Sequence, residues 1–111
     1  MTFIDLFRPR WKHSNPQIRL EAVEKGKSQV VLEAVAQHDS DESVRAAAVK
    51  KLDSQQVLGS VMRDDVSERV RLVAVEKVKD QVVLEAVAQY DSDESVRAAA
   101  VKKLDSQQVL G

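Results

Sequence analysis

The stretch DSDESVRAAAVKKLDSQQVLG occupies residues 39–59 and recurs, letter for letter, at residues 91–111. The duplication extends further, because residues 29–59 match residues 81–111 with one difference, His38 against Tyr90. A shift of 26 residues aligns the chain more loosely, and it brings the Ile/Val-Arg dipeptides at positions 18, 44, 70 and 96 into register. Self-similarity at 20–50 residues is typical of stacked repeat arrays. We therefore predict a 26-residue unit that is present four times.

The apolar spacing within one unit indicates helices. The first segment places apolar residues at i, i+3, i+4 and i+8, which are Val44, Ala47, Ala48 and Leu52. A second apolar stripe covers residues 57–62, and Asp53 and Ser54 between the two segments are preferred N-cap residues. Each unit is thus predicted to be a helical hairpin with a first helix of about a dozen residues, a tight turn and a second helix of about ten.

The starts of the first helices carry acidic pairs. Asp39 and Glu42 have the spacing of a capping box, and the same pair recurs at residues 65/68 and 91/94. We therefore expect Asp39 and its two equivalents to be N-cap residues.

A hairpin of this size cannot bury its apolar faces alone, and stacking on the next hairpin solves the problem. The predicted fold is all-α, an α-solenoid (superhelix) of stacked antiparallel helix pairs. A single domain at 14–111 would contain units at about 14–38, 39–64, 65–90 and 91–111, the last incomplete, after an N-terminal capping segment at 1–13. In that segment a short extra helix is expected to use Phe3, Ile4, Leu6, Phe7 and Trp11. The alternative is an ordinary helix bundle with accidental similarity, which four in-register copies disfavour.

DSDESVRAAAVKKL and its copies resemble HEAT-like repeats, particularly the short kind of bilin-lyase-type proteins. The resemblance implies that an aspartate caps each first helix and also bonds an arginine of a neighbouring repeat, which forms a ladder along the solenoid. The matching ladder positions are Asp39, Asp65 and Asp91 with Arg45, Arg71 and Arg97. The first copy has Arg19, but His13 stands where the aspartate is expected. The family includes scaffolds, adaptors, nucleic-acid binders and a few enzymes, so the resemblance does not select a function.

Most catalytic chemistry is disfavoured by composition. The absence of cysteine excludes disulfides, thiolate metal sites and a cysteine nucleophile. His13 and His38 have no neighbouring carboxylates at ligand spacing, and there is no glycine-rich phosphate loop. We expect no catalytic residue, metal or cofactor, and we expect His38 to be a solvent-facing residue at the end of a second helix. No apolar run approaches the ~20 residues needed to span a bilayer, so a soluble cytoplasmic protein is the default expectation.

The N-terminal stretch FRPRWKHS (residues 7–14) is the one compositional oddity. It gathers Arg8, Arg10 and Lys12 around the only tryptophan, Trp11. As a functional site it would contact an acidic partner, nucleic acid or an anionic surface. The alternative, which we favour, is a structural role, in which the stretch is part of the N-terminal capping segment. The inner face of the array is expected, by analogy, to present residues of the second helices, namely Gln29, Glu33, Gln37, Gln55, Arg63, Gln81, Glu85 and Gln89.

The leading functional hypothesis is a non-enzymatic repeat scaffold for protein–protein interaction. The alternatives are nucleic-acid or anion binding through the basic N-terminal segment and an accessory or lyase-like role with a bilin cofactor. A net charge of −1 makes whole-molecule attraction to nucleic acid or a membrane surface unfavourable. The near-identity of the two halves also fits a recent tandem duplication or an engineered repeat protein.

Two departures from the repeat lead to further expectations. Gly26 stands where Leu52, Val78 and Leu104 occupy core positions, which suggests an αL C-cap and predicts that Gly26→Leu raises the melting temperature. In the fourth unit a turn near residues 103–106 should precede a second helix of half length, SQQVLG. The apolar face left open would recruit another chain, and domain swapping is a second route to a homo-oligomer.

Overall fold

The computed structural model describes residues 8–110, and it describes side chains up to residue 108. The described residues are all-helical. In chain order the elements are η2 (Arg10–Lys12, a 3-10 turn), α1 (Pro16–Lys25), α2 (Gln29–His38), α3 (Glu42–Lys50), α4 (Gln55–Asp64), α5 (Glu68–Val75), α6 (Gln81–Tyr90) and α7 (Glu94–Leu110). The chain divides into two compact units, 1–52 and 53–111.

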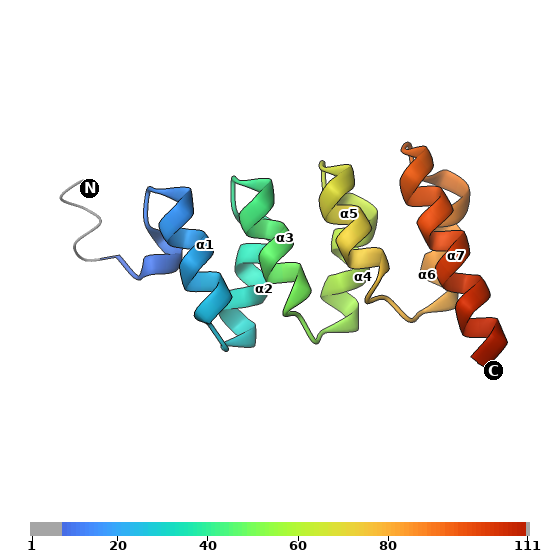
Figure 1. Ribbon diagram of the computed structural model, residues 1–111, viewed down its shortest axis with the longest axis horizontal. Coiled ribbons are helices and arrows are strands. Elements are labelled where there is room, and N and C mark those ends of the chain that lie inside the picture. Colours follow the sequence, from blue (N-terminus) through green and yellow to red (C-terminus); the bar gives the residue numbers. More distant parts are fainter. Residues whose placement is uncertain (1–7, 111) are drawn as a thin grey trace. The chain divides into compact units, whose positions relative to one another are not determined.

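The N-terminal unit contains α1, α2 and α3 (Figure 1). Helix α2 packs against α3 across the short loop 39–41, and α1 also packs against α3. The interior is built from aliphatic side chains of all three helices, with Val23, Leu32, Val44 and Ala48 almost fully buried. Burial of such side chains is the main stabilising contribution for a unit this small.

The C-terminal unit repeats this arrangement. Helix α4 packs against α5, α6 packs against α7, and α5 lies against α7. Its core contains Leu58, Met62, Val70, Leu84 and Val96, each fully buried. Within the two units, the helix pairs in closest contact are joined by the loops 39–41, 65–67 and 91–93. The break that the sequence predicts between the helices around Val44 and Leu58 is present at residues 51–54.

The helix starts correct the capping prediction. Asp41, not Asp39, is the N-cap of α3, and its carboxylate accepts hydrogen bonds from the backbone of Ser43 and Val44 at 2.8 and 3.1 Å. Asp39 lies two residues earlier, where its Oδ1 accepts the backbone N–H of Asp41 at 2.9 Å. Asp65 and Asp91 accept the backbone N–H groups of residues 67 and 93 in the same way. The predicted cap was wrong because these aspartates bond a backbone N–H of the loop before the helix, and not one of the helix's first turn.

The prediction for the fourth unit was also wrong. Helix α7 continues from Glu94 to Leu110, although residues 39–59, of identical sequence, end α3 at Lys50 and begin α4 at Gln55. In the first copy Gln29 Nε2 donates to the carbonyl oxygen of Lys51 at 3.0 Å, and Ser54 caps α4 by accepting from Val57 N at 3.2 Å. In the second copy Ser106 Oγ instead bonds the carbonyl of Lys102 within the helix, at 3.0 Å.

Gly26 ends α1 in an extended conformation, with φ −75° and ψ 151°, and is not the expected αL cap. A Cβ at this position would lie 2.9 Å from the backbone oxygen of Ala22, closer than real Cβ contacts allow. Leu52 buries its side chain at the equivalent position of the next repeat. A side chain of this kind does not fit at Gly26 unless the backbone shifts. The expectation that Gly26→Leu is stabilising is reversed.

A glycine pair tests this conclusion. Gly26→Ala is expected to lower the free energy of unfolding by roughly 1 kcal/mol because of the close contact. Gly59→Ala, inside α4, is expected to raise it by about 0.5–1 kcal/mol, because its Cβ would meet only Val83 Cγ1 at 3.8 Å and alanine favours helix. Urea unfolding followed by circular dichroism measures both. A Gly26→Ala variant at least as stable as the wild type would contradict the steric account.

Candidate binding groove

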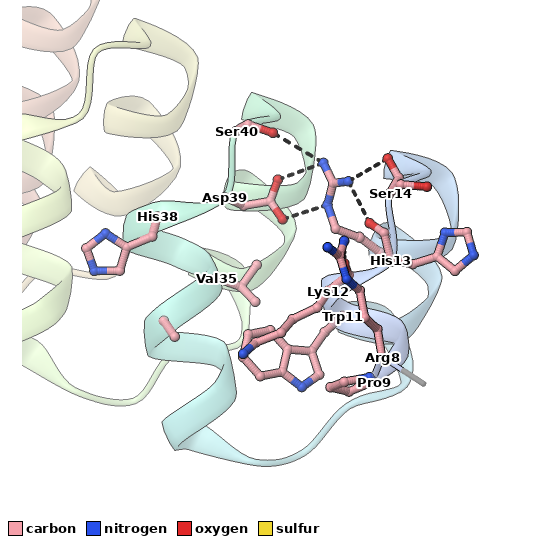
Figure 2. Close-up of a pocket in the computed structure, with 12 residues that line it drawn as sticks. Arg8, Pro9, Trp11, Lys12, His13, Ser14, Val35, His38, Asp39 and Ser40 are labelled. Carbon is pink, nitrogen blue, oxygen red and sulfur yellow. Dashed lines mark hydrogen bonds and ion pairs between the residues drawn. The ribbon is translucent and has the colours of Figure 1, made fainter. Parts of the chain in front are cut away.

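A groove of about 930 Å³ lies in the N-terminal unit between residues 8–14 and the second half of α2 (Figure 2). We call it the N-terminal groove. It is lined by Arg8, Pro9, Trp11, Lys12, His13, Ser14, Arg19, Ala34, Val35, His38, Asp39 and Ser40. The sequence-predicted basic segment thus contributes one wall, and α2 with its following loop contributes the other.

An ion pair fixes one end of this groove. Arg19 donates from Nε to Asp39 Oδ2 at 3.0 Å and from Nη2 to Oδ1 at 3.2 Å, in a fork that matches the carboxylate. Its Nη1 donates to the backbone oxygens of His13 and Ser14 at 2.9 and 3.0 Å, as the dashed lines in Figure 2 show. The guanidinium therefore ties α1, the N-terminal segment and the loop after α2 together. This arginine supports the groove and is not available to hold a ligand.

Trp11 and Lys12 form the basic wall. The half-buried indole lies below the Lys12 ammonium, with Nζ 4.9 Å from the ring centroid, a cation–π geometry. Arg8 Nη1 donates to the backbone oxygen of Lys12 at 3.3 Å, which keeps this second cation along the same wall. The segment therefore combines a structural role, since Trp11 is partly covered, with two cations at an open groove. The expected capping residues Phe3, Ile4, Leu6 and Phe7 lie outside the described residues.

The two histidines have different environments. His13 is buried, and its Nδ1 accepts the backbone N–H of Asn15, the N-cap of α1, at 3.0 Å. In Figure 2 its ring points away from Trp11. His38 is exposed at the end of α2, as expected, but it also lines the groove. This placement could not be predicted from the sequence, because nothing local to His38 shows which segment faces it.

Other residues proposed for partner binding lie elsewhere. Arg10 Nη2 is 3.9 Å from Glu21 of α1, and Arg10 does not line the groove. Glu33 and Gln37 on α2, and Glu85 and Gln89 on α6, keep solvent exposure, and Arg63 lines a separate groove. Two glutamines assigned to an inner face have structural bonds instead, because Gln29 and Gln55 donate to the carbonyls of Lys51 and Lys77.

The second unit repeats the ion pair 52 residues later. Arg71 donates from Nε to Asp91 Oδ2 at 2.9 Å and from Nη2 to Oδ1 at 3.1 Å, and from Nη1 to the backbone oxygen of Asp65 at 2.7 Å. Arg45 and Arg97 make the equivalent backbone bond to Asp39 and Asp91, at 2.8 and 2.6 Å. Within each unit, therefore, an arginine of one predicted repeat holds the aspartate of the next.

The charges around the N-terminal groove favour an anionic ligand. Arg8 and Lys12 are exposed and positively charged, and Asp39, the only carboxylate that lines the groove among residues 8–110, is already paired with Arg19. Within residues 8–110 no group of three or more histidines and carboxylates could hold a metal ion. In the same part of the chain, none of the helices combines the length and apolar character needed to traverse a bilayer.

Comparison with family models, curated proteins and solved structures found no match to this chain.

Proposed function

We propose that this chain is a non-enzymatic helical-repeat scaffold that binds an acidic segment of a partner protein in the N-terminal groove. In this proposal the four 26-residue units form an α-solenoid of the HEAT-like type. The observation that carries the binding role is the groove wall of Trp11 and Lys12, where the exposed Lys12 ammonium lies over the indole. Among residues 8–110, Asp39 is the only carboxylate that lines the groove, and it is paired with Arg19.

Internal repetition supports the solenoid part of the proposal. Each of the two compact units contains one forked ion pair, Arg19–Asp39 in the first and Arg71–Asp91 in the second. Both pairs are largely buried. The valine that follows the repeated alanine is buried at Val23 in α1 and at Val75 in α5. On each of these first helices the next first helix packs, α3 on α1 and α7 on α5. Stacked repeats have this property, because each interface is a copy of the preceding one.

The groove chemistry favours a peptide over a nucleic acid. Ala34 and Val35 give the α2 side of the groove an apolar floor, which suits an aliphatic side chain beside an acidic one. Nucleic-acid binding draws its affinity from many phosphate contacts and an extended basic surface. This chain has net charge −1, so a single groove with the exposed cation Lys12 fits a short acidic segment better.

A charge-reversal variant tests the proposed function. Lys12→Glu is expected to weaken binding of a fluorescein-labelled eight-residue peptide of alternating Glu and Leu by roughly tenfold, since it replaces a charge-assisted contact by repulsion. Fluorescence anisotropy measures the affinity. Lys27→Glu is the matched control, because it makes the same change of charge at an exposed residue of the same unit outside the groove.

The outcomes separate the alternatives. If Lys12→Glu and Lys27→Glu bind the peptide with equal affinity, the N-terminal groove is not the binding site. Tighter binding of a single-stranded oligonucleotide than of the peptide, with a steep salt dependence, would favour the nucleic-acid function instead.

A further inference from the structure

The C-terminal unit contains a second groove at the same positions of the repeat. This C-terminal groove, of about 210 Å³, is lined by Arg63, Ala86, Val87, Tyr90 and Asp91. Subtracting 52 from each number gives positions 11, 34, 35, 38 and 39, and all five line the N-terminal groove. The two grooves are therefore equivalent features of the repeat, each complete within its own unit.

The floor and one end are unchanged between the grooves. An Ala-Val pair on the second helix forms the floor in both, as Ala34-Val35 and as Ala86-Val87. The adjoining aspartate is held in both by a forked arginine, at 3.0 Å from Nε in the first unit and 2.9 Å in the second. The carboxylate of Asp91 is thus neutralised, as that of Asp39 is, and does not repel an anion.

The walls of the two grooves differ at two equivalent positions. In each groove one of these positions holds an aromatic side chain and the other a basic one, but in opposite order. The N-terminal groove has Trp11 and His38, whereas the C-terminal groove has Arg63 and Tyr90. The His38/Tyr90 difference is also the single substitution in the 31-residue copy. The duplicated stretch has therefore diverged only at a groove wall, and the pairing of an aromatic with a nitrogen base is retained.

The chemical groups of the C-terminal groove are available to a ligand. Arg63, in the last turn of α4, is exposed, and its guanidinium makes no hydrogen bond or ion pair within residues 8–110. Tyr90 is 81% exposed at the end of α6, and in the same range its hydroxyl has no partner. A guanidinium presents a planar fork to a carboxylate, and a phenol adds a donor at the edge of a ring that an aliphatic side chain can contact.

We propose that the C-terminal groove is a second binding site for an acidic peptide segment, with a carboxylate on Arg63 and an adjacent aliphatic side chain between Val87 and Tyr90. This inference rests on the proposed function, because it assigns the same ligand class to both grooves. The chain then has two sites for one ligand class, and a partner whose two acidic segments are joined by a linker long enough to span the sites gains affinity.

Isothermal titration calorimetry with the alternating Glu-Leu peptide tests the proposal. The wild-type chain is expected to bind about two peptides, whereas Arg63→Glu leaves the site at the N-terminal groove and weakens the other roughly tenfold. Lys102→Glu is the matched control, since Lys102 is an exposed cation of the same unit outside the groove. Tyr90→Ala should also weaken only the C-terminal site. Far-UV circular dichroism checks that each variant keeps its helices.

The results distinguish this inference from the function on which it rests. If the wild-type chain has a single site that Lys12→Glu removes and Arg63→Glu leaves intact, the proposal for the C-terminal groove is wrong and the proposal for the N-terminal groove is supported. Two sites that respond separately to Lys12→Glu and Arg63→Glu would support both. Equal effects of Arg63→Glu and Lys102→Glu would show a non-specific charge effect and overturn the assignment to Arg63. No binding by the wild-type chain would overturn both proposals.

Discussion

Replacing Arg71 with methionine is expected to lower the free energy of unfolding by about 3–5 kcal/mol, the usual cost of removing one partner of a buried ion pair. The side chains of Arg71 and Asp91 are only 10% and 5% exposed, and two hydrogen bonds of 2.9 and 3.1 Å join them. Methionine would keep much of the aliphatic stem but leave the Asp91 carboxylate buried without its counter-charge. Urea unfolding followed by far-UV circular dichroism measures the loss.

Arg97→Met provides the control within the same unit. Arg97 Nη1 donates to the backbone oxygen of Asp91 at 2.6 Å, as Arg71 Nη1 donates to that of Asp65 at 2.7 Å, but Arg97 holds no carboxylate within residues 8–110. Its substitution should therefore cost about 1 kcal/mol, the value of one hydrogen bond. Equal losses for the two variants would contradict the carboxylate as the source of the effect. Adding Asp91→Leu to Arg71→Met should restore part of the stability, because the unpaired charge is then removed.

Helix content followed from local patterns. The 3.6-residue spacing of apolar side chains predicted helices around Val44 and Leu58, and Ser54 between them was predicted as an N-cap and is one. These features depend on residues within one turn of each other, so a single sequence contains the necessary information. Helix lengths were less accurate, since α3 and α5 contain nine and eight residues rather than about a dozen.

Features that depend on distant partners were not predictable in this way. Asp39 and Asp41 are equally good cap residues by type, and Asp39 is drawn to the Arg19 guanidinium 20 residues earlier. The C-terminal groove was also missed, although its signal was present in the sequence as the lone His38/Tyr90 substitution. A substitution inside an otherwise identical copy identifies a position but not the surface to which it belongs. That surface requires α4 and α6 to be placed side by side.

Helix α7 shows this limit most clearly, because no local signal can distinguish two identical sequences. Residues 51–54 form the connection before α4, whereas residues 103–106 lie inside α7. The turn of the first copy depends on a contact from outside it, the bond from Gln29 to Lys51 O at 3.0 Å. The equivalent residue of the second copy, Gln81, makes no side-chain hydrogen bond within residues 8–110. Without that bond the continuous helix keeps its own backbone hydrogen bonds, which stabilises α7 as an unbroken element.

Proline at one repeat position is therefore expected to have different effects in the two copies. Gln107→Pro removes a backbone donor inside α7 and sets its ring against the carbonyl of Lys103, at a cost of about 3 kcal/mol to that helix. Because none of residues 103–108 is buried, we expect the end of α7 to unwind from about residue 103. The observable results are a loss of ellipticity at 222 nm and coil-like Cα chemical shifts for residues 103–110.

The matched substitution, Gln55→Pro, falls on the first residue of α4, where proline is favoured because its missing N–H would have no helical partner. Ser54 before it is already extended, with φ −68° and ψ 114°, as a residue preceding proline requires. The remaining cost is the loss of the two Gln55 side-chain bonds, to Lys77 O and from Lys79 N, each 2.9 Å, or about 1–2 kcal/mol. Helix content should then stay close to that of the wild type. Similar ellipticity in the two variants would mean that residues 103–106 already form a turn in solution, and that identical sequence does produce identical conformation in the two halves of this chain.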